Sequence, residues 1–262
     1  MFDIMKAFRL DGKLAIITGG SGLYGRQMLL ALAQAGAKVC NASRNLEKNE
    51  AYADQLRAQG YDVFCEKLDQ GDPHSISAFI DKIRGEYGRI DVFVNNAVWR
   101  GMKHDEDWEG FTTSLRINAV GMSDLTMKIA KIMRDNGGGS IINIGSYMGI
   151  LGANDMLYRG TDMPQVVDFC PDYFYHKGGM ANWTRLMASK FGPFGVRVNV
   201  LQLGGFFNHQ PEKFVEMYSD CTLLKRMAND TDIMGAIVWL ASDASAYVTG
   251  ASIPIDGGYS AK

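Results

Sequence analysis

The fold of this chain is decided by the stretch Leu14–Gly25, which reads LAIITGGSGLYG. Leu14–Ile17 is a short, unbroken apolar run, as expected for a strand that is buried on both faces of a parallel sheet. From about Leu23 to Ala35 apolar residues recur with a helical period, and Gly36 then ends the helix. The local order is therefore strand, glycine-rich turn and helix.

The glycine-rich turn TGGSGLYG predicts a site for the pyrophosphate of a dinucleotide. Its glycines let the backbone turn tightly and approach an anion closely, and the next helix directs N–H groups and a positive dipole end at that anion. With 30 glycines in the chain a triplet alone means little, but the position between a strand and a helix is the required context. The residues of the turn expected to contact the dinucleotide are Gly19, Ser21, Gly22, Leu23, Tyr24 and Gly25.

Outward from this unit, apolar runs alternate with helical patterns along the chain. Strands are expected at about 14–17, 38–40, 62–65, 90–94, 140–144, 197–201 and 252–255, and helices at about 23–35, 46–59, 73–87, 108–134, 172–191 and 232–241. This alternation predicts a doubly wound parallel sheet of about seven strands, a Rossmann-type α/β fold with helices on both faces. No linker or repeat interrupts it, so residues 1–262 are expected to form a single domain.

Two long segments lack this rhythm, at about 148–171 and 204–228. Both follow the carboxyl ends of expected strands, where open parallel sheets bind ligands. Long loops within compact domains usually carry function. We interpret the first segment as a substrate-loop insertion and the second as a substrate lid.

Composition argues against several classes of protein. The formal net charge is -2, and no basic cluster indicates nucleic-acid binding. No apolar run reaches the roughly 18 residues of a membrane span, and the N-terminus does not resemble a signal peptide. The four cysteines form no C-x-x-C pair and the four histidines lack metal-ligand spacing. We therefore expect a soluble, cytoplasmic protein with reduced thiols, no metal, and no nucleic-acid or membrane partner.

The end of the second strand bears on the type of dinucleotide. NAD-binding folds usually place an acidic residue there to hold the ribose 2′-hydroxyl, whereas an arginine accommodates a 2′-phosphate. This chain has Ser43 and Arg44 at that point and no acidic residue. Both are expected to contact the cofactor, and Arg44 favours NADP(H) over NAD(H).

Tyr173 and Lys177 are the candidates for proton transfer. They are four residues apart on an expected helix and therefore share one face. A neighbouring cation favours phenolate and should lower the pKa of the tyrosine, which could then exchange a proton with a carbonyl oxygen. Ser146 ends the fifth strand, where its hydroxyl can bond to the same oxygen.

Taken together, these motifs resemble the short-chain dehydrogenase/reductase family. The segments that carry the resemblance are TGGSGLYG, Asn95-Asn96-Ala97, Asn118, Ser146, Tyr173–Lys177 and Ile255–Gly258. The resemblance covers almost the whole chain. It implies an NAD(P)-dependent oxidoreductase that moves a hydride between the nicotinamide and a carbonyl or secondary alcohol.

The resemblance implies further roles and an assembly. Asn118 would complete the catalytic set by holding a water beside Lys177, which would also bind the nicotinamide ribose. Asp69 would contact the adenine, and Asn95 and Ala97 would lie at the cofactor. The family also implies a homo-oligomer, here a homotetramer.

The spacing of the catalytic residues departs from the family pattern, because Ser146 and Tyr173 lie much farther apart than in most members. Tyr158 is nearer to Ser146, but Asp162 rather than a lysine follows it by one turn. Tyr175 lies on another helix face. Tyr173 is therefore retained as the catalytic tyrosine, together with an insertion before it.

Polar residues of the insertion favour a hydroxylated substrate such as a sugar or polyol, whose hydroxyls need partners. Tyr158, Arg159 and Phe206, with Ser146, are the candidate substrate contacts. Two alternatives stay open, a reductase of a 3-oxoacyl or other ketone substrate and a non-catalytic NAD(P)-binding regulator. A sugar-nucleotide epimerase would need a larger C-terminal domain than this length allows.

Overall fold

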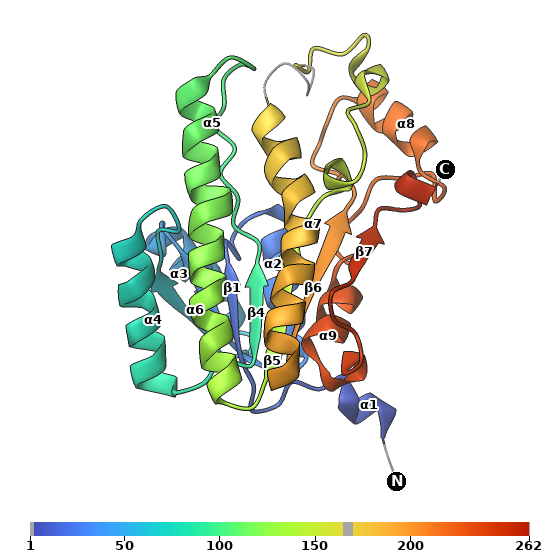
Figure 1. Ribbon diagram of the computed structural model, residues 1–262. Helices are drawn as coiled ribbons and strands as arrows, with labels where there is room; N and C mark the ends of the chain where they lie inside the picture. Colours follow the sequence, from blue (N-terminus) through green and yellow to red (C-terminus); the bar gives the residue numbers. More distant parts are fainter. Residues whose placement is uncertain (1–2, 165–169, 262) are drawn as a thin grey trace.

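The computed structural model describes residues 3–164 and 170–261. Its centre is one seven-stranded sheet in which every neighbouring pair is parallel, with helices on both faces (Figure 1). The strands are β1 (Leu14–Thr18), β2 (Lys38–Ser43), β3 (Val63–Lys67), β4 (Val92–Asn95), β5 (Gly139–Ile144), β6 (Val196–Leu203) and β7 (Ser252–Ile255). Their order across the sheet is β3-β2-β1-β4-β5-β6-β7, which confirms the expected doubly wound Rossmann-type fold.

The helices form two layers that bury the sheet. They are α1 (Ile4–Ala7), α2 (Leu23–Gln34), α3 (Leu46–Arg57), α4 (Pro73–Tyr87), α5 (Trp108–Leu115), α6 (Met122–Asp135), α7 (Pro171–Phe191), α8 (Glu212–Cys221) and α9 (Met234–Ala241). Side chains of α2, α3 and α9 pack in one core cluster, and those of α4, α6 and α7 in a second. The second layer faces the viewer in Figure 1.

Local signals explain where individual helices begin and end. Asp72 caps α4 by accepting a hydrogen bond from the His74 N–H at 2.9 Å, and Pro73 occupies the first turn. Gly88, with φ of 71°, ends the same helix in the left-handed conformation. The expected bounds 73–87 and 252–255 agree with α4 and β7.

The long helix expected at about 108–134 is divided by a π-helical stretch, Arg116–Gly121, between α5 and α6. Gly121 lies against the main chain of Gln70, where an added Cβ would be 1.7 Å from the carbonyl oxygen. The Gln70 side chain donates to the Ile117 carbonyl at 3.0 Å, which gives this main-chain oxygen of the π-helical stretch a hydrogen-bond partner. Such π-bulges occur frequently at functional sites.

The two irregular segments contain more structure than the sequence predicted. Short 3-10 turns, Tyr147–Gly149 and Asp155–Tyr158, lie in or beside the segment 148–171, of which residues 165–169 fall outside the described part. The segment 204–228 contains the ten-residue helix α8, which the sequence reading did not anticipate.

Candidate active site

A cleft of about 780 Å³ opens at the carboxyl ends of the central strands. The order of the chain reverses between β1 and β4, and parallel sheets bind ligands at such a switch point. The structure brings most of the expected site residues to its wall. These are Gly19, Ser21, Gly22, Leu23, Tyr24, Gly25, Ser43, Arg44, Asp69, Ala97, Ser146, Tyr158, Tyr173, Lys177 and Phe206.

The glycine turn is shaped as a close-packed cradle. Gly19 has φ of 67°, a left-handed conformation that a side chain would strain. A Cβ on Gly25 would lie 2.3 Å from the Gly19 carbonyl oxygen, so only glycine lets α2 start this close to the turn. Gly22 is the N-cap of α2 and has no side chain to satisfy the first N–H groups of the helix. Those donors suit a phosphate, and the turn therefore fits a dinucleotide.

Asparagine side chains hold this cradle. The Asn96 side chain donates to the carbonyls of Thr18 and Gly19 at 3.0 and 2.9 Å. On the other side, the Gly20 N–H donates to the Asn41 side chain at 3.0 Å, and the Ser21 hydroxyl donates to Asn49 at 2.8 Å. The conformation of the turn is thus fixed by the chain itself.

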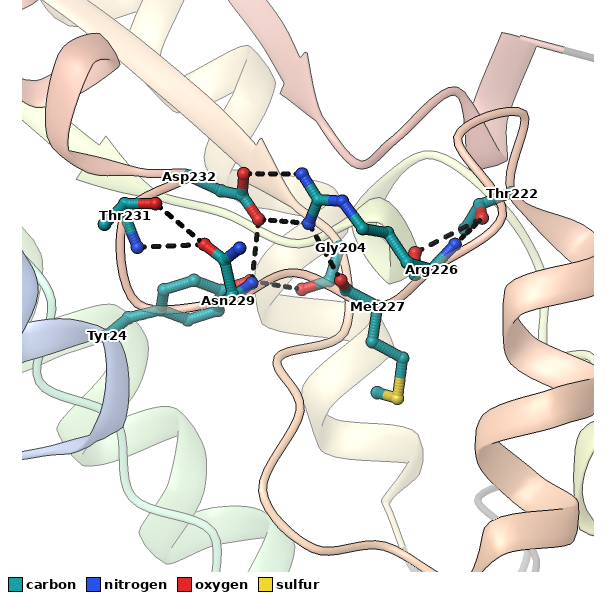
Figure 2. Close-up of polar contacts among 8 residues, drawn as sticks. All are labelled: Tyr24, Gly204, Thr222, Arg226, Met227, Asn229, Thr231 and Asp232. Carbon is teal, nitrogen blue, oxygen red and sulfur yellow. Dashed lines mark hydrogen bonds and ion pairs between the residues drawn. The ribbon is translucent and has the colours of Figure 1, made fainter.

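Tyr24 connects the cradle to the segment 204–228. Its hydroxyl donates to the Gly204 carbonyl at 3.0 Å, and its ring meets Phe206 edge-on at 4.8 Å between centroids. Figure 2 shows this bond beside the ion pair of Arg226 and Asp232, whose closest atoms lie 2.5 Å apart. The ion pair ties Arg226, near the end of the segment 204–228, to Asp232, which follows the segment. The bond from Tyr24 holds the first residue of the segment, Gly204, so both ends of the segment are anchored.

Three expected cofactor contacts lie at the far side of the cleft. Arg44 follows β2 directly, with an exposed side chain, and Ser43 is the last residue of that strand. Asp69 follows β3 and accepts a hydrogen bond from the Gly71 N–H at 2.8 Å. All three are within the cleft wall, as the ribose and adenine half of a dinucleotide would require.

Tyr173, Lys177 and Ser146 meet at the opposite end. Tyr173 and Lys177 lie one turn apart on α7, with the Lys177 ammonium nitrogen 5.6 Å from the centroid of the Tyr173 ring. Lys177 is buried and donates to the Ile144 carbonyl at 2.5 Å. The Ser146 oxygen accepts from the Met148 N–H at 3.2 Å, which leaves its hydroxyl proton for Tyr173 or a ligand.

Burial dominates the acid–base properties of these groups. It raises the pKa of Tyr173, while Arg100 and a hydrogen bond from Ser146 oppose the rise. The expectation of a lowered tyrosine pKa is therefore wrong for the chain alone, because the cost of desolvating the phenolate exceeds the nearby positive charge. Burial and then the charge of Arg100 lower the pKa of Lys177 to about 7. Burial thus moves the pKa values of Tyr173 and Lys177 apart, because it favours the neutral form of each group.

Asn118 is buried in the π-helical stretch beside this pair, behind the cleft wall. Its side chain accepts from the Trp99 N–H at 2.7 Å and donates to the Trp99 carbonyl at 2.8 Å. It also lies 3.3 Å from His176, whose pKa burial lowers to about 3. In this structure the Asn118 side chain holds the main chain after β4.

Of the candidate substrate contacts, Tyr158 and Phe206 line the cleft and Arg159 does not. Tyr158 packs against Phe214 in an aromatic cluster at the cleft, and burial raises the Tyr158 pKa to about 12. Phe206 lies at the wall. Arg159 is exposed and is not among the described residues that line the cleft. Tyr175, the rejected catalytic candidate, is also exposed, with 67% of its surface accessible.

The chain is similar to known proteins over almost its whole length. Residues 24–260 match a family model described as enoyl-(acyl carrier protein) reductase. The D-threitol dehydrogenase of Mycolicibacterium smegmatis is 32% identical over 97% of this chain and 95% of its own. The 3-oxoacyl-[acyl-carrier-protein] reductase of Thermotoga maritima is 29% identical over 95% and 98%. A gluconate 5-dehydrogenase from Burkholderia cenocepacia, solved with NADP and tartrate, superposes with a TM-score of 0.88 at 27% identity, covering 99% and 100% of the chains.

The chain belongs to the short-chain dehydrogenase/reductase family. It is therefore an NAD(P)-dependent oxidoreductase, as the sequence motifs implied. No described helix of this short-chain dehydrogenase/reductase is long and apolar enough to cross a membrane. Within the described ranges, no group of three His, Cys, Asp or Glu side chains is placed to hold a metal ion.

Several site residues of this short-chain dehydrogenase/reductase were missed by sequence reasoning. Asn41 and Asn49 brace the glycine turn, and their burial within a strand and a helix leaves no local signal. Asn96 was quoted only as part of a motif. Arg100 lies over the Tyr173 ring, with its guanidinium carbon 4.8 Å from the centroid. Its approach depends on how the loop after β4 meets α7, which no sequence spacing reveals.

Proposed function

We propose that Ser146, Tyr173 and Lys177 catalyse hydride transfer between a nicotinamide and a secondary alcohol or ketone of a hydroxylated substrate. The observation that carries this proposal is the meeting of these three side chains at one end of a cleft whose other end is the glycine turn. One ligand long enough to span the cleft would contact both. A non-catalytic regulator would not need the buried lysine, which is costly to fold.

A bound nicotinamide would supply or accept the hydride. The chain supplies the proton, because a raised pKa keeps the Tyr173 phenol protonated at neutral pH and ready to donate to a forming alkoxide. Ser146 donates a hydrogen bond to the same oxygen, because accepting from the Met148 N–H leaves its hydroxyl proton available. In the oxidative direction Tyr173 accepts the proton, with Lys177 and Arg100 favouring the phenolate.

For the substrate, we propose a sugar or polyol. Relatives named for threitol and gluconate support a hydroxylated substrate. We interpret residues 148–171 as an insertion over the reacting centre and residues 204–228 as a lid over the cofactor. Tyr158 from the first segment and Phe206 from the second belong to the cleft wall in keeping with these roles.

For the cofactor, we propose NADP(H) in preference to NAD(H). Arg44 offers an exposed guanidinium where the 2′-phosphate of the adenine ribose would lie, and no acidic residue follows β2 directly. Two structural neighbours were solved with NADP.

We further propose a cytoplasmic homotetramer. Large apolar side chains are exposed on α5, on the π-helical stretch that follows it and on α7, namely Trp108, Val120, Tyr175 and Leu186. A second copy is the simplest cover for such side chains, since symmetric assemblies repeat one self-complementary patch. The four cysteines form no disulfide, in keeping with a reducing compartment. Light scattering that gives a stable monomer at micromolar concentration would contradict the assembly.

The function is tested by incubating the purified protein with NADP⁺ or NADPH and a panel of polyols, sugars, sugar acids and 3-oxoacyl thioesters. The absorbance of the reduced nicotinamide reports turnover. We expect turnover with a hydroxylated substrate and none in a Tyr173→Phe variant that still binds NADPH. Turnover of a 3-oxoacyl thioester alone would favour the second candidate, which the Thermotoga maritima relative supports.

A further inference from the structure

Arg100 is a cation at the catalytic end of the cleft. Its guanidinium lies against the ring of Tyr173, and the residue belongs to the cleft wall. Among the residues that the structure describes, it forms no ion pair and no hydrogen bond. A guanidinium has five N–H donors in a fixed planar fork. Stacking on a ring occupies its face and leaves its donor edges available to a ligand.

The main chain holds Arg100 in this position. The preceding residue, Trp99, is fixed at both its N–H and its carbonyl by the buried Asn118 side chain. The following Gly101 lies under the Trp99 ring, where an added Cβ would be 2.3 Å from a ring carbon. The contacts of its two neighbours thus fix the main chain at Arg100, although the residue itself is exposed.

The basic residues of the described cleft wall near Tyr173 have no acidic neighbour in that wall, although the buried Asp172 behind it also acts on Tyr173 and raises its pKa. Of the described residues that line the cleft, Asp69 is the only acid, and it lies after β3 at the adenine end. Around Tyr173 the charged wall residues are Arg100 and Lys177. The positive charge of Arg100 acts on the reacting residues. It contributes to the lowered pKa values of Lys177 and His176, and it opposes the rise that burial causes in the Tyr173 pKa. No carboxylate of the described wall balances this charge there.

We infer that Arg100 binds a carboxylate of the substrate, so that the enzyme acts on a hydroxy acid, an aldonate-type sugar acid, rather than on a neutral polyol. This inference rests on the proposed function and narrows its substrate class. A planar carboxylate matches the edge of a guanidinium with two parallel hydrogen bonds. One guanidinium balances its single charge, whereas a phosphate monoester carries about two negative charges at neutral pH. Because Arg100 contacts the Tyr173 ring, the carboxylate and the reacting hydroxyl can belong to one small molecule.

The test measures binding and does not depend on turnover. Aldonates of four to six carbons and their matched alditols are titrated by calorimetry into the NADP⁺-saturated protein and its Arg100→Gln and Arg100→Lys variants. A charge-assisted hydrogen bond contributes about 1.5–3 kcal/mol, and Arg100→Gln should therefore weaken aldonate binding about 10- to 100-fold. Alditol binding should change little. Arg100→Lys should fall between, because it keeps the charge without the fork.

Kinetics separate carboxylate binding from the influence of Arg100 on Tyr173. Loss of that influence changes kcat for acids and alditols alike, whereas loss of a carboxylate contact raises KM for acids alone. The inference is overturned if the wild type binds no aldonate, if it binds aldonates and alditols equally, or if Arg100→Gln leaves aldonate binding unchanged. It is also overturned if alditol phosphates bind more tightly than aldonates through Arg100. Turnover of neutral alditols by the wild type would leave the proposed function standing while the carboxylate inference fails, whereas failure of the wild type to bind NADP(H) would remove that function itself.

Discussion

The Tyr24 hydroxyl donates a hydrogen bond to the Gly204 carbonyl across 180 positions of sequence, at 3.0 Å. One residue belongs to the first turn of α2, and the other follows β6. The bond therefore joins the glycine turn to the first residue of the segment interpreted as a lid. Because both residues line the cleft, the shape of the cofactor end depends on this contact.

Tyr24→Phe should loosen that connection and weaken cofactor binding a few-fold, since one neutral hydrogen bond contributes about 1 kcal/mol. The measurement is the Kd for NADPH from nicotinamide fluorescence. Tyr52→Phe is a matched control, because its hydroxyl also donates to a main-chain carbonyl, that of Arg26, at 3.0 Å and lies outside the cleft wall. Both variants should lose similar stability. Equal effects of the two on NADPH affinity would contradict a role for Tyr24 in shaping the cleft.

Tyr173→Phe should reduce kcat by roughly 10²–10⁴-fold, the usual cost of losing general acid–base catalysis. The protein should fold and bind NADPH normally, because the ring still packs against Arg100 and Lys177. Tyr158→Phe and Tyr175→Phe are the controls and should cost far less. If Tyr158→Phe abolished turnover while Tyr173→Phe retained it, the catalytic tyrosine would be misassigned.

Lys177→Met should change how stability depends on pH. The Lys177 pKa falls from 10.5 to about 7 on folding, and between these values the unfolded chain holds a proton that the folded chain lacks. Wild-type stability should therefore rise with pH through this window, relative to the variant, and the difference should be constant below about pH 7. Denaturant midpoints at several pH values measure it.

Lys190→Met, at an exposed position on the same helix, is the control for the loss of a lysine side chain from α7. A wild-type advantage over Lys177→Met that instead falls as pH rises would mean that Lys177 is charged and stabilised in the folded protein.

Arg44→Asp should shift preference from NADP(H) toward NAD(H). A carboxylate repels the 2′-phosphate and can bind a 2′-hydroxyl. Loss of a charge-assisted contact of about 1.5–3 kcal/mol corresponds to roughly 10- to 100-fold weaker NADPH binding. Titration of both cofactors into both proteins checks this, and tighter binding of NADH than NADPH by the wild type would defeat the premise.

The sequence predicted regular elements best where local chemistry defined their ends. The helix Pro73–Tyr87 has a capping aspartate, a first-turn proline and a terminal glycine, and its bounds agree with expectation. The helix Glu212–Cys221 has no side-chain cap and was missed. The π-helical stretch Arg116–Gly121 was also missed, because its cause is the approach of Gln70 from a distant loop.

By itself the sequence determined the doubly wound sheet, the glycine turn and the pairing of Tyr173 with Lys177. These depend on periodicity and on spacing along single elements, which local sequence contains. Only the tertiary structure decided that Arg100 covers Tyr173, that Tyr24 meets Gly204, and that burial outweighs charge in raising the Tyr173 pKa. Those properties depend on distances between segments remote in sequence and on the exclusion of water, and both exist only once the chain has folded.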